Sequence, residues 1–345
     1  VFIDQVGKKK GTLTRENWET LLAAPKGEAF SPQDIDQLRA RHAKLIQQAK
    51  LAATRTSVID LSKIRSEGRA KEFCAEFPKA GMLHVHPWGT MDHETVSAAL
   101  SFVGATVDVP AMKTNLTNPQ SERIVYPGEL DFLPSSTIAY KSLNTATQKS
   151  LRNLFFLPPG HHDFKRFDGG FGLADYWLES DDARAPSALV FTALFRRARS
   201  QGLMYLELSS DVPNNQNDLD HYDSVARQAA QDFGLTVRFL GSFNRMGDPV
   251  KNRARAQNML SLRPAKSFIG INLLANETNA PALESGQSIY GPVSAAVEKG
   301  GSRLHRTMHA GELGDVRNVR DAILMGSERI GHGVNLHQDP VTLEY

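Results

Sequence analysis

The 345-residue sequence contains a single cysteine, Cys74, so no disulfide can form within the chain. We therefore expect packing to hold the fold, and a bound metal could add support. The sequence also lacks a run of about 18 or more apolar residues, which argues against a transmembrane helix. An excess of charge of one sign is missing too, because 40 basic and 38 acidic side chains leave a formal net charge of +2. We therefore expect neither nucleic acid nor a membrane surface as the partner, and a small molecule instead.

What is present is an ordinary globular composition, with 41% hydrophobic and 23% charged residues. This is enough to bury the core of one large α/β domain with an appendage. Because the chain begins with Val1 and not with methionine, we expect further residues ahead of it in the translated product, and a signal peptide is one option.

Residues 1–75 are predicted to form a helical N-terminal extension. At Ser31-Pro32-Gln33-Asp34, a capping hydroxyl, a proline at the first helical position and an acid three residues on indicate a helix start. One stripe then recurs at helical spacing, formed by Ile35, Leu38, His42 and Leu45. Such a stripe packs against another surface, and a homodimer through the N-terminal helices is one arrangement that would bury it.

Residues 76–345 show short apolar runs that alternate with amphipathic helices. Strands are predicted at residues 82–86, 203–208, 236–241, 268–274, 306–309 and 329–331. Helices are predicted at residues 187–200 and 224–233, and a further one through Val319, Ala322 and Ile323. This rhythm predicts parallel βαβ units, and hence an α/β fold of the TIM (β/α)8 barrel type, whose functional side chains gather where the strands end.

Residues 104–180 interrupt this rhythm with many Pro, Asn and Gly residues and with the Phe-rich segment 151–157. We expect a lid-like insertion that supplies a lid or a substrate wall over the mouth of the barrel. A disordered surface loop is the alternative, and the apolar residues of the segment disfavour it because they need burial.

Three short segments at predicted strand ends carry residues suited to metal chemistry. His84 and His86 lie two residues apart on a strand, so both imidazoles point to the same side and can share one metal ion. His309-Ala310-Gly311-Glu312 offers a third imidazole and, in Glu312, a general acid or base. His332 lies between two glycines that leave its ring accessible to a metal-bound water or a developing oxyanion.

These H-x-H, H-A-G-E and G-H-G motifs occur in the order found in the adenosine deaminase family of metal-dependent amidohydrolases, and the chain resembles that family from about residue 78 to its end. Residues 203–208 resemble the family's second strand, and residues 270–277 its substrate-contacting fourth strand. The N-terminal extension, residues 78–83 and Thr90-Met91-Asp92 resemble the secreted, growth-factor-related branch, which favours export over a cytoplasmic location.

The resemblance implies that His84, His86 and His309 bind one Zn²⁺ per chain. It further implies that Glu312 protonates N1 of a purine and that His332 positions the attacking hydroxide. Zinc lowers the pKa of a bound water to about 7, so hydroxide is available at neutral pH. The implied reaction is the hydrolytic deamination of adenosine or deoxyadenosine to inosine or deoxyinosine, with release of ammonia.

The chain departs from the family pattern at its end. The family carries an Asp-Asp pair on its last barrel strand, as a further metal ligand and a second acid, whereas the only aspartate after His332 in this chain is Asp339. The sequence stops at Tyr345, shortly after the sixth predicted strand. An open barrel of six strands would expose two unpaired edges. We therefore expect that the natural protein continues, and that the last strands are absent from this sequence.

Two further departures concern the substrate. Trp88 stands where the small deaminases of the family have an acid that holds the ribose; its indole can stack on a sugar or base, or pack beneath the lid. Ala275 stands where the family usually has a glycine whose backbone meets the purine. Either change could shift specificity towards a modified adenosine or another aminated heterocycle. A third reading, a non-catalytic growth-factor-like homologue, is motivated by the N-terminal extension and the absent acidic pair.

Overall fold

The computed structural model describes residues 66–76, 81–117, 124–126, 135–157, 160, 163–178, 184–278, 280 and 282–344. The helix predicted from Ser31 and its stripe lie outside these ranges, so the homodimer stays a prediction. The described part of the predicted N-terminal extension contains helix α4 (Glu67–Glu76). Within the described ranges, none of the helices has the length and hydropathy that crossing a membrane requires.

The six predicted strands are confirmed, with small shifts at their ends. They are β1 (Gly81–Val85), β5 (Tyr205–Asp211), β6 (Thr236–Asn244), β7 (Phe268–Leu274), β8 (His305–Ala310) and β9 (Arg329–His332). These strands form one sheet in the order β1-β5-β6-β7-β8-β9, and the pairs β1–β5, β5–β6 and β8–β9 are parallel. Sequential order with parallel pairing is the strand arrangement of a (β/α) barrel.

A helix joins each consecutive pair of strands from β5 to β9. In chain order these helices are α10 (Gln216–Phe233), α11 (Pro249–Ser261), α12 (Ala282–Glu298) and α13 (Arg317–Leu324). Helix α9 (Arg184–Ser200) leads into β5, and η5 (Leu336–Gln338) and α14 (Pro340–Glu344) follow β9. Helix α10 begins earlier than its apolar pattern predicts, because the side chain of Asn215 caps it by accepting a hydrogen bond from the Asp218 N–H at 3.1 Å.

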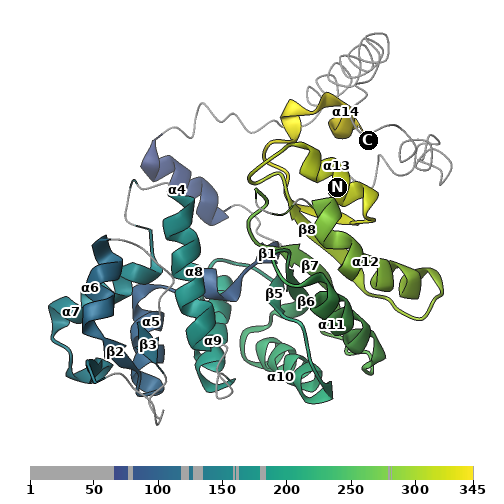
Figure 1. The fold of residues 1–345 in the computed structure, drawn as a ribbon. Helices are drawn as coiled ribbons and strands as arrows, with labels where there is room; N and C mark the ends of the chain where they lie inside the picture. The colour runs from purple at the N-terminus through teal and green to yellow at the C-terminus, as the bar shows by residue number, and fades with distance from the viewer. Residues whose placement is uncertain are drawn as a thin grey trace. The chain divides into compact units, whose positions relative to one another are not determined.

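The segment between β1 and α9 is folded in its described part (Figure 1). Its elements are η2 (Pro87–Thr90), α5 (His93–Phe102), β2 (Thr106–Asp108), α6 (Val109–Thr117), β3 (Val125–Tyr126), β4 (Thr137–Ala139), η3 (Tyr140–Ser142), α7 (Thr145–Arg152), η4 (Asn153–Phe155) and α8 (Phe164–Leu178). Strand β2 pairs antiparallel with both β3 and β4 to make a second, smaller sheet.

The predicted insertion, residues 104–180, has a hydrophobic core in its described part. Val107, Leu151 and Leu154 are buried there together with Tyr140. The Tyr140 hydroxyl hydrogen-bonds with Ser97 Oγ at 2.9 Å and accepts a hydrogen bond from Arg152 Nη1 at 3.0 Å. The described part is thus not the disordered loop weighed as an alternative, while its role as a lid stays a prediction.

The chain divides into two compact units. One comprises Glu72–Ser242 and Ser261–Ile271, and it holds the small sheet and its core. The other comprises, in its described part, residues 66–71, 243–260, 272–278, 280 and 282–344, and it holds β8 and β9 with helices α12 and α13. Strands β6 and β7 contribute residues to both.

Gly234 gives a test of the backbone at the end of α10. It caps the helix with a left-handed φ of 63°, and a Cβ added there would meet nothing within 4 Å. We predict that Gly234→Ala lowers the free energy of unfolding by about 1–2 kcal/mol through backbone strain alone. Gly169→Ala inside α8, where a Cβ is equally unobstructed, should raise it by about 0.5–1 kcal/mol. Urea denaturation measures the free energy of unfolding of both variants. If both substitutions changed it in the same direction, the prediction would be contradicted.

Candidate metal centre and active site

The H-x-H motif lies where β1 ends. His84 belongs to the strand and His86 follows it, and their ring centroids are 5.2 Å apart in an edge-to-face arrangement. Val85 between them is buried, as alternation along a strand requires. Pro87 lacks an N–H for a further ladder hydrogen bond, so the chain leaves the strand and enters η2.

Trp88, predicted as a substrate contact or as a packing residue, packs against the hydrophobic core beside α9. Its ring centroid lies 6.1 Å from that of Phe191, and it is partly buried against the core cluster. A Cβ on the neighbouring Gly89 would come within 2.8 Å of Phe171 Cζ, so this segment sits close to α8 as well. These contacts show packing for Trp88, and a contact with substrate stays a prediction.

Asp92 and Arg197 fix the end of the same segment. Asp92 caps α5 by accepting a hydrogen bond from the Thr95 N–H at 2.8 Å, and it forms an ion pair with Arg197, which also donates to the Thr90 carbonyl at 2.6 Å. Burial alone would raise the pKa of Asp92, but the hydrogen bonds from Thr95 and the charge of Arg197 outweigh burial and lower it. The segment after the H-x-H motif is therefore anchored to α9.

His309 is buried on β8 and is oriented by a side chain of β7. Its Nδ1 lies 3.1 Å from Oδ1 of Asn272, a residue that is fully buried. An Nδ1–H that donates to the amide oxygen leaves the lone pair on Nε2, which is the form that binds a metal. Sequence reasoning did not single out Asn272, although a polar residue inside the apolar run 268–274 was the available signal.

Three imidazoles of the described residues form a group that could hold a metal ion. Ligand atoms of His84, His86 and His309 all lie within 4.8 Å of one another. Imidazole nitrogen suits zinc among the metals that proteins use, and three protein ligands are what catalytic zinc sites commonly supply. The donor set therefore fits the zinc that the sequence implies, while its binding and stoichiometry stay predictions.

Glu312 and His332 lie next to each other, and His332 lies beside His309. Oε2 of Glu312 is 3.3 Å from Nε2 of His332, and the ring of His332 lies 4.8 Å, centroid to centroid, from that of His309. Both side chains are partly exposed, so they can be reached from solvent. His332 itself adopts a φ of 80°, in the left-handed region that non-glycine residues rarely occupy.

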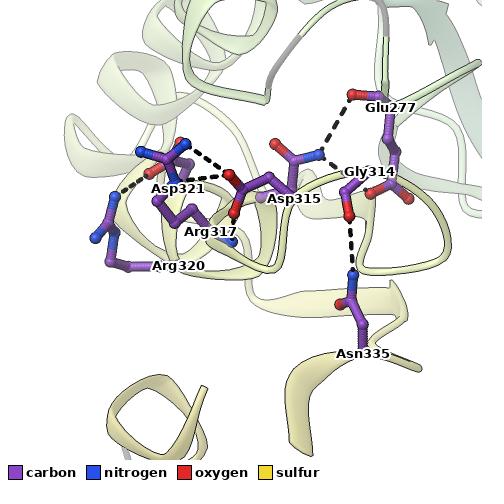
Figure 2. Close-up of polar contacts among 8 residues, drawn as sticks. Glu277, Gly314, Asp315, Arg317, Arg320, Asp321 and Asn335 are labelled. Carbon is purple, nitrogen blue, oxygen red and sulfur yellow. Dashed lines mark hydrogen bonds and ion pairs between the residues drawn. The ribbon is translucent and has the colours of Figure 1, made fainter. Parts of the chain in front are cut away.

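Gly311 turns the chain sharply after β8, with a φ of 79°. An added Cβ would lie 2.5 Å from Asn335 Oδ1 and 2.7 Å from Val319 Cγ2, so only glycine fits this position of the H-A-G-E motif. In the loop that follows, Asn335 donates to the Gly314 carbonyl at 3.5 Å, and Figure 2 shows Glu277 on the other side of Gly314. Side chains of Asn335 and Val319 therefore surround Gly311, and Asn335 and Glu277 lie next to Gly314.

Comparison with known families decides the relationship. The family model described as "Adenosine deaminase" matches residues 135–345, which is more than half of the chain. The chain belongs to the adenosine deaminase family. Membership in the adenosine deaminase family confirms the resemblance drawn from the three motifs and the TIM-barrel type of α/β fold.

Curated relatives match parts of the chain. An adenosine deaminase of Clostridium perfringens is 42% identical over 79 residues, 23% of this chain and 23% of that protein. An adenine deaminase of Aspergillus oryzae is 30% identical over 162 residues, 44% of each chain. The chain therefore spans less than half the length of these two relatives of the adenosine deaminase family.

Two solved structures align with this chain. The structure of the ADAL–IMP complex aligns with a TM-score of 0.50 at 15% identity, covering 76% of this chain and 66% of that one. An amidohydrolase from Burkhoderia ambifaria, solved with bound zinc, has a TM-score of 0.49 at 22% identity and covers 83% of this chain and 65% of that one.

Ala275, whose contact with a substrate stays a prediction, has a φ of 82° directly after β7. We predict that Ala275→Gly raises the free energy of unfolding by about 0.5–1 kcal/mol, because relief of left-handed strain exceeds the added entropy of the unfolded chain. Denaturant titration measures this shift. The matched control is Ala295→Gly on the exposed side of α12, which should lower the free energy by about 1 kcal/mol. A loss of stability at Ala275 would show that the left-handed conformation is not strained.

Proposed function

We propose that the protein is a zinc-dependent hydrolase that deaminates an aminopurine, with adenosine and deoxyadenosine as the first candidates. The observation that supports this most directly is the group of His84, His86 and His309 beside the contact between Glu312 and His332. A metal group alone would fit many hydrolases. A carboxyl and an imidazole at 3.3 Å from each other beside it add a proton donor and a group that can orient water.

In this proposal His84, His86 and His309 hold one Zn²⁺, which when bound supplies a water molecule acidified enough to attack at neutral pH. Asn272 keeps His309 in the tautomer that offers Nε2. Glu312 donates a proton to N1 of the purine ring, which makes C6 electrophilic. His332 accepts a hydrogen bond from the attacking water and, once protonated, stabilises the negative charge that develops on its oxygen. The C6 amine takes the proton from His332 and leaves as ammonia, while the new C6 hydroxyl returns a proton to Glu312, so water supplies the oxygen of the product and the acid is restored.

Free adenine is the second candidate substrate. Among the relatives described above, the adenine deaminase of Aspergillus oryzae matches a longer stretch of this chain than the adenosine deaminase of Clostridium perfringens does. The packing of Trp88 against Phe191 adds to this, because an indole in that position cannot accept a hydrogen bond from a ribose hydroxyl. Both candidates share the attack on C6, so they differ only in whether the sugar is recognised.

The first test is turnover by the full-length, zinc-loaded protein. We expect loss of the adenine absorbance on incubation with at least one of adenosine, deoxyadenosine, N6-methyladenosine and adenine. Removal of the metal with a chelator should abolish the reaction, and added Zn²⁺ should restore it. An absence of turnover with every member of this panel would overturn the proposal and favour a non-catalytic homologue.

The second test is Glu312→Gln, which keeps the size of the side chain but removes its acidic proton. We expect kcat to fall by roughly 10²–10⁴-fold, as for the loss of a general acid, with the zinc content unchanged. Steady-state kinetics and elemental analysis measure the two quantities. Glu298→Gln, at an exposed position near the end of α12, is the matched control and should leave both unchanged. A Glu312→Gln variant as active as the wild type would exclude the proposed acid.

A further inference from the structure

Glu277 is a buried carboxylate that reaches the turn of the H-A-G-E motif from the segment after β7. Only 3% of the residue is exposed. Its Oε2 accepts a hydrogen bond from the Gly311 N–H at 2.8 Å, and its Oε1 accepts one from the Glu312 N–H at 3.1 Å. Asn318 on α13 donates to the same carboxylate and to the Glu277 carbonyl, each at 3.4 Å; Figure 2 labels Glu277 and marks these polar contacts to its carboxylate and its carbonyl.

A buried cation holds the other end of the same motif. Arg245, which is 3% exposed, donates from Nη2 to the His309 carbonyl at 2.5 Å, and further to the carbonyls of Leu274 and Ala280, each at 3.3 Å. Burial lowers the pKa of the Arg245 guanidinium, and the negative charge of Glu277 opposes this effect. The tetrapeptide from His309 to Glu312 is therefore held by a positive group at its first carbonyl and by a negative group at its last two amides.

Both oxygens of Glu277 accept backbone N–H groups, so a carboxylate is required and an amide is a poor substitute. A glutamine would turn its NH₂ group towards one of the two N–H donors and leave that donor unsatisfied in the interior. Gly311, between β8 and Glu312, is also the residue with the greatest backbone freedom in the turn. Two charge-assisted hydrogen bonds on consecutive amides restrict that freedom directly.

We propose that Glu277 is a positioning residue: it fixes the Gly311–Glu312 backbone and thereby the place where Glu312 presents its carboxyl group. The catalytic consequence rests on the function proposed above, whereas the structural consequence does not. Glu277 acts through the backbone, because its two carboxylate oxygens accept the Gly311 and Glu312 N–H groups.

Hydrogen–deuterium exchange tests the structural consequence without any assay of activity. In the full-length protein we expect the amides of Gly311 and Glu312 to exchange slowly. In Glu277→Gln we expect faster exchange at these two amides, with peptides from α10 and β5 unchanged. Glu298→Gln should match the wild type throughout. If the two amides of the wild type exchange as fast as those of the exposed loop after Glu312, the proposal is overturned, and this measurement stands even if Glu277→Gln does not fold.

Kinetics with adenosine or adenine, whichever is turned over, test the catalytic consequence. We expect Glu277→Gln to lower kcat by roughly 10- to 100-fold, as for other residues that orient a catalytic group, with KM and zinc content little changed. A rise in KM with kcat intact, or a loss of zinc, would overturn the positioning role. If exchange at Gly311 and Glu312 rises while the wild type itself lacks activity, the proposed function fails and the structural part of the inference stands.

Discussion

The site depends on two buried charges of opposite sign that bind one short stretch of backbone. Removing an arginine and a glutamate from water costs several kcal/mol each unless hydrogen bonds replace their hydration. Arg245 recovers this through three carbonyls, and Glu277 through two backbone amides and an asparagine side chain. Because His309 and Glu312 are only three residues apart, whatever holds this stretch sets the imidazole and the carboxyl together. One arrangement of the backbone therefore fixes the proposed metal ligand and the proposed proton donor at once.

Left-handed backbone conformations at the ends of three strands also constrain where the nearby side chains lie. Ala275 follows β7, Gly311 follows β8 and His332 ends β9, with φ values of 82°, 79° and 80°. Such residues turn the chain within a single peptide, so the following side chains stay close to the end of the sheet and do not move off into a long loop. Glycine adopts this conformation without cost, but alanine and histidine do not, and strain of this kind is characteristic of functional sites. His332, one of the proposed catalytic groups, is itself a strained residue. This indicates that the position of its side chain is kept at a cost in backbone energy.

The strands and the candidate histidines could be predicted from the sequence. The buried residues that hold the H-A-G-E segment in place could not. Each of the six strands is a short apolar run, so its existence follows from a local pattern, and the H-x-H, H-A-G-E and G-H-G motifs are local as well. The start of α10 was missed because Asn215 lies in a polar stretch without apolar periodicity. The contacts of Asn272, Glu277 and Arg245 with the H-A-G-E segment join residues far apart in the chain. A local pattern cannot reveal such pairs, since only the arrangement of the strands brings them together.

The proposed chemistry and the recognition of a sugar depend on different residues. In the proposed function Glu312 and His332 act on the amine-bearing ring, and that ring is the same in adenosine and in adenine, so the proposed chemistry does not distinguish the two substrates. Trp88, which was predicted as a substrate contact or a packing residue, lies in an aromatic contact with Phe191. Burial of a side chain of this size stabilises the fold, so the packing role of Trp88 is accounted for without a substrate. A ribose bound at this protein would then need a hydrogen-bond acceptor from another segment, whereas a free base would need none.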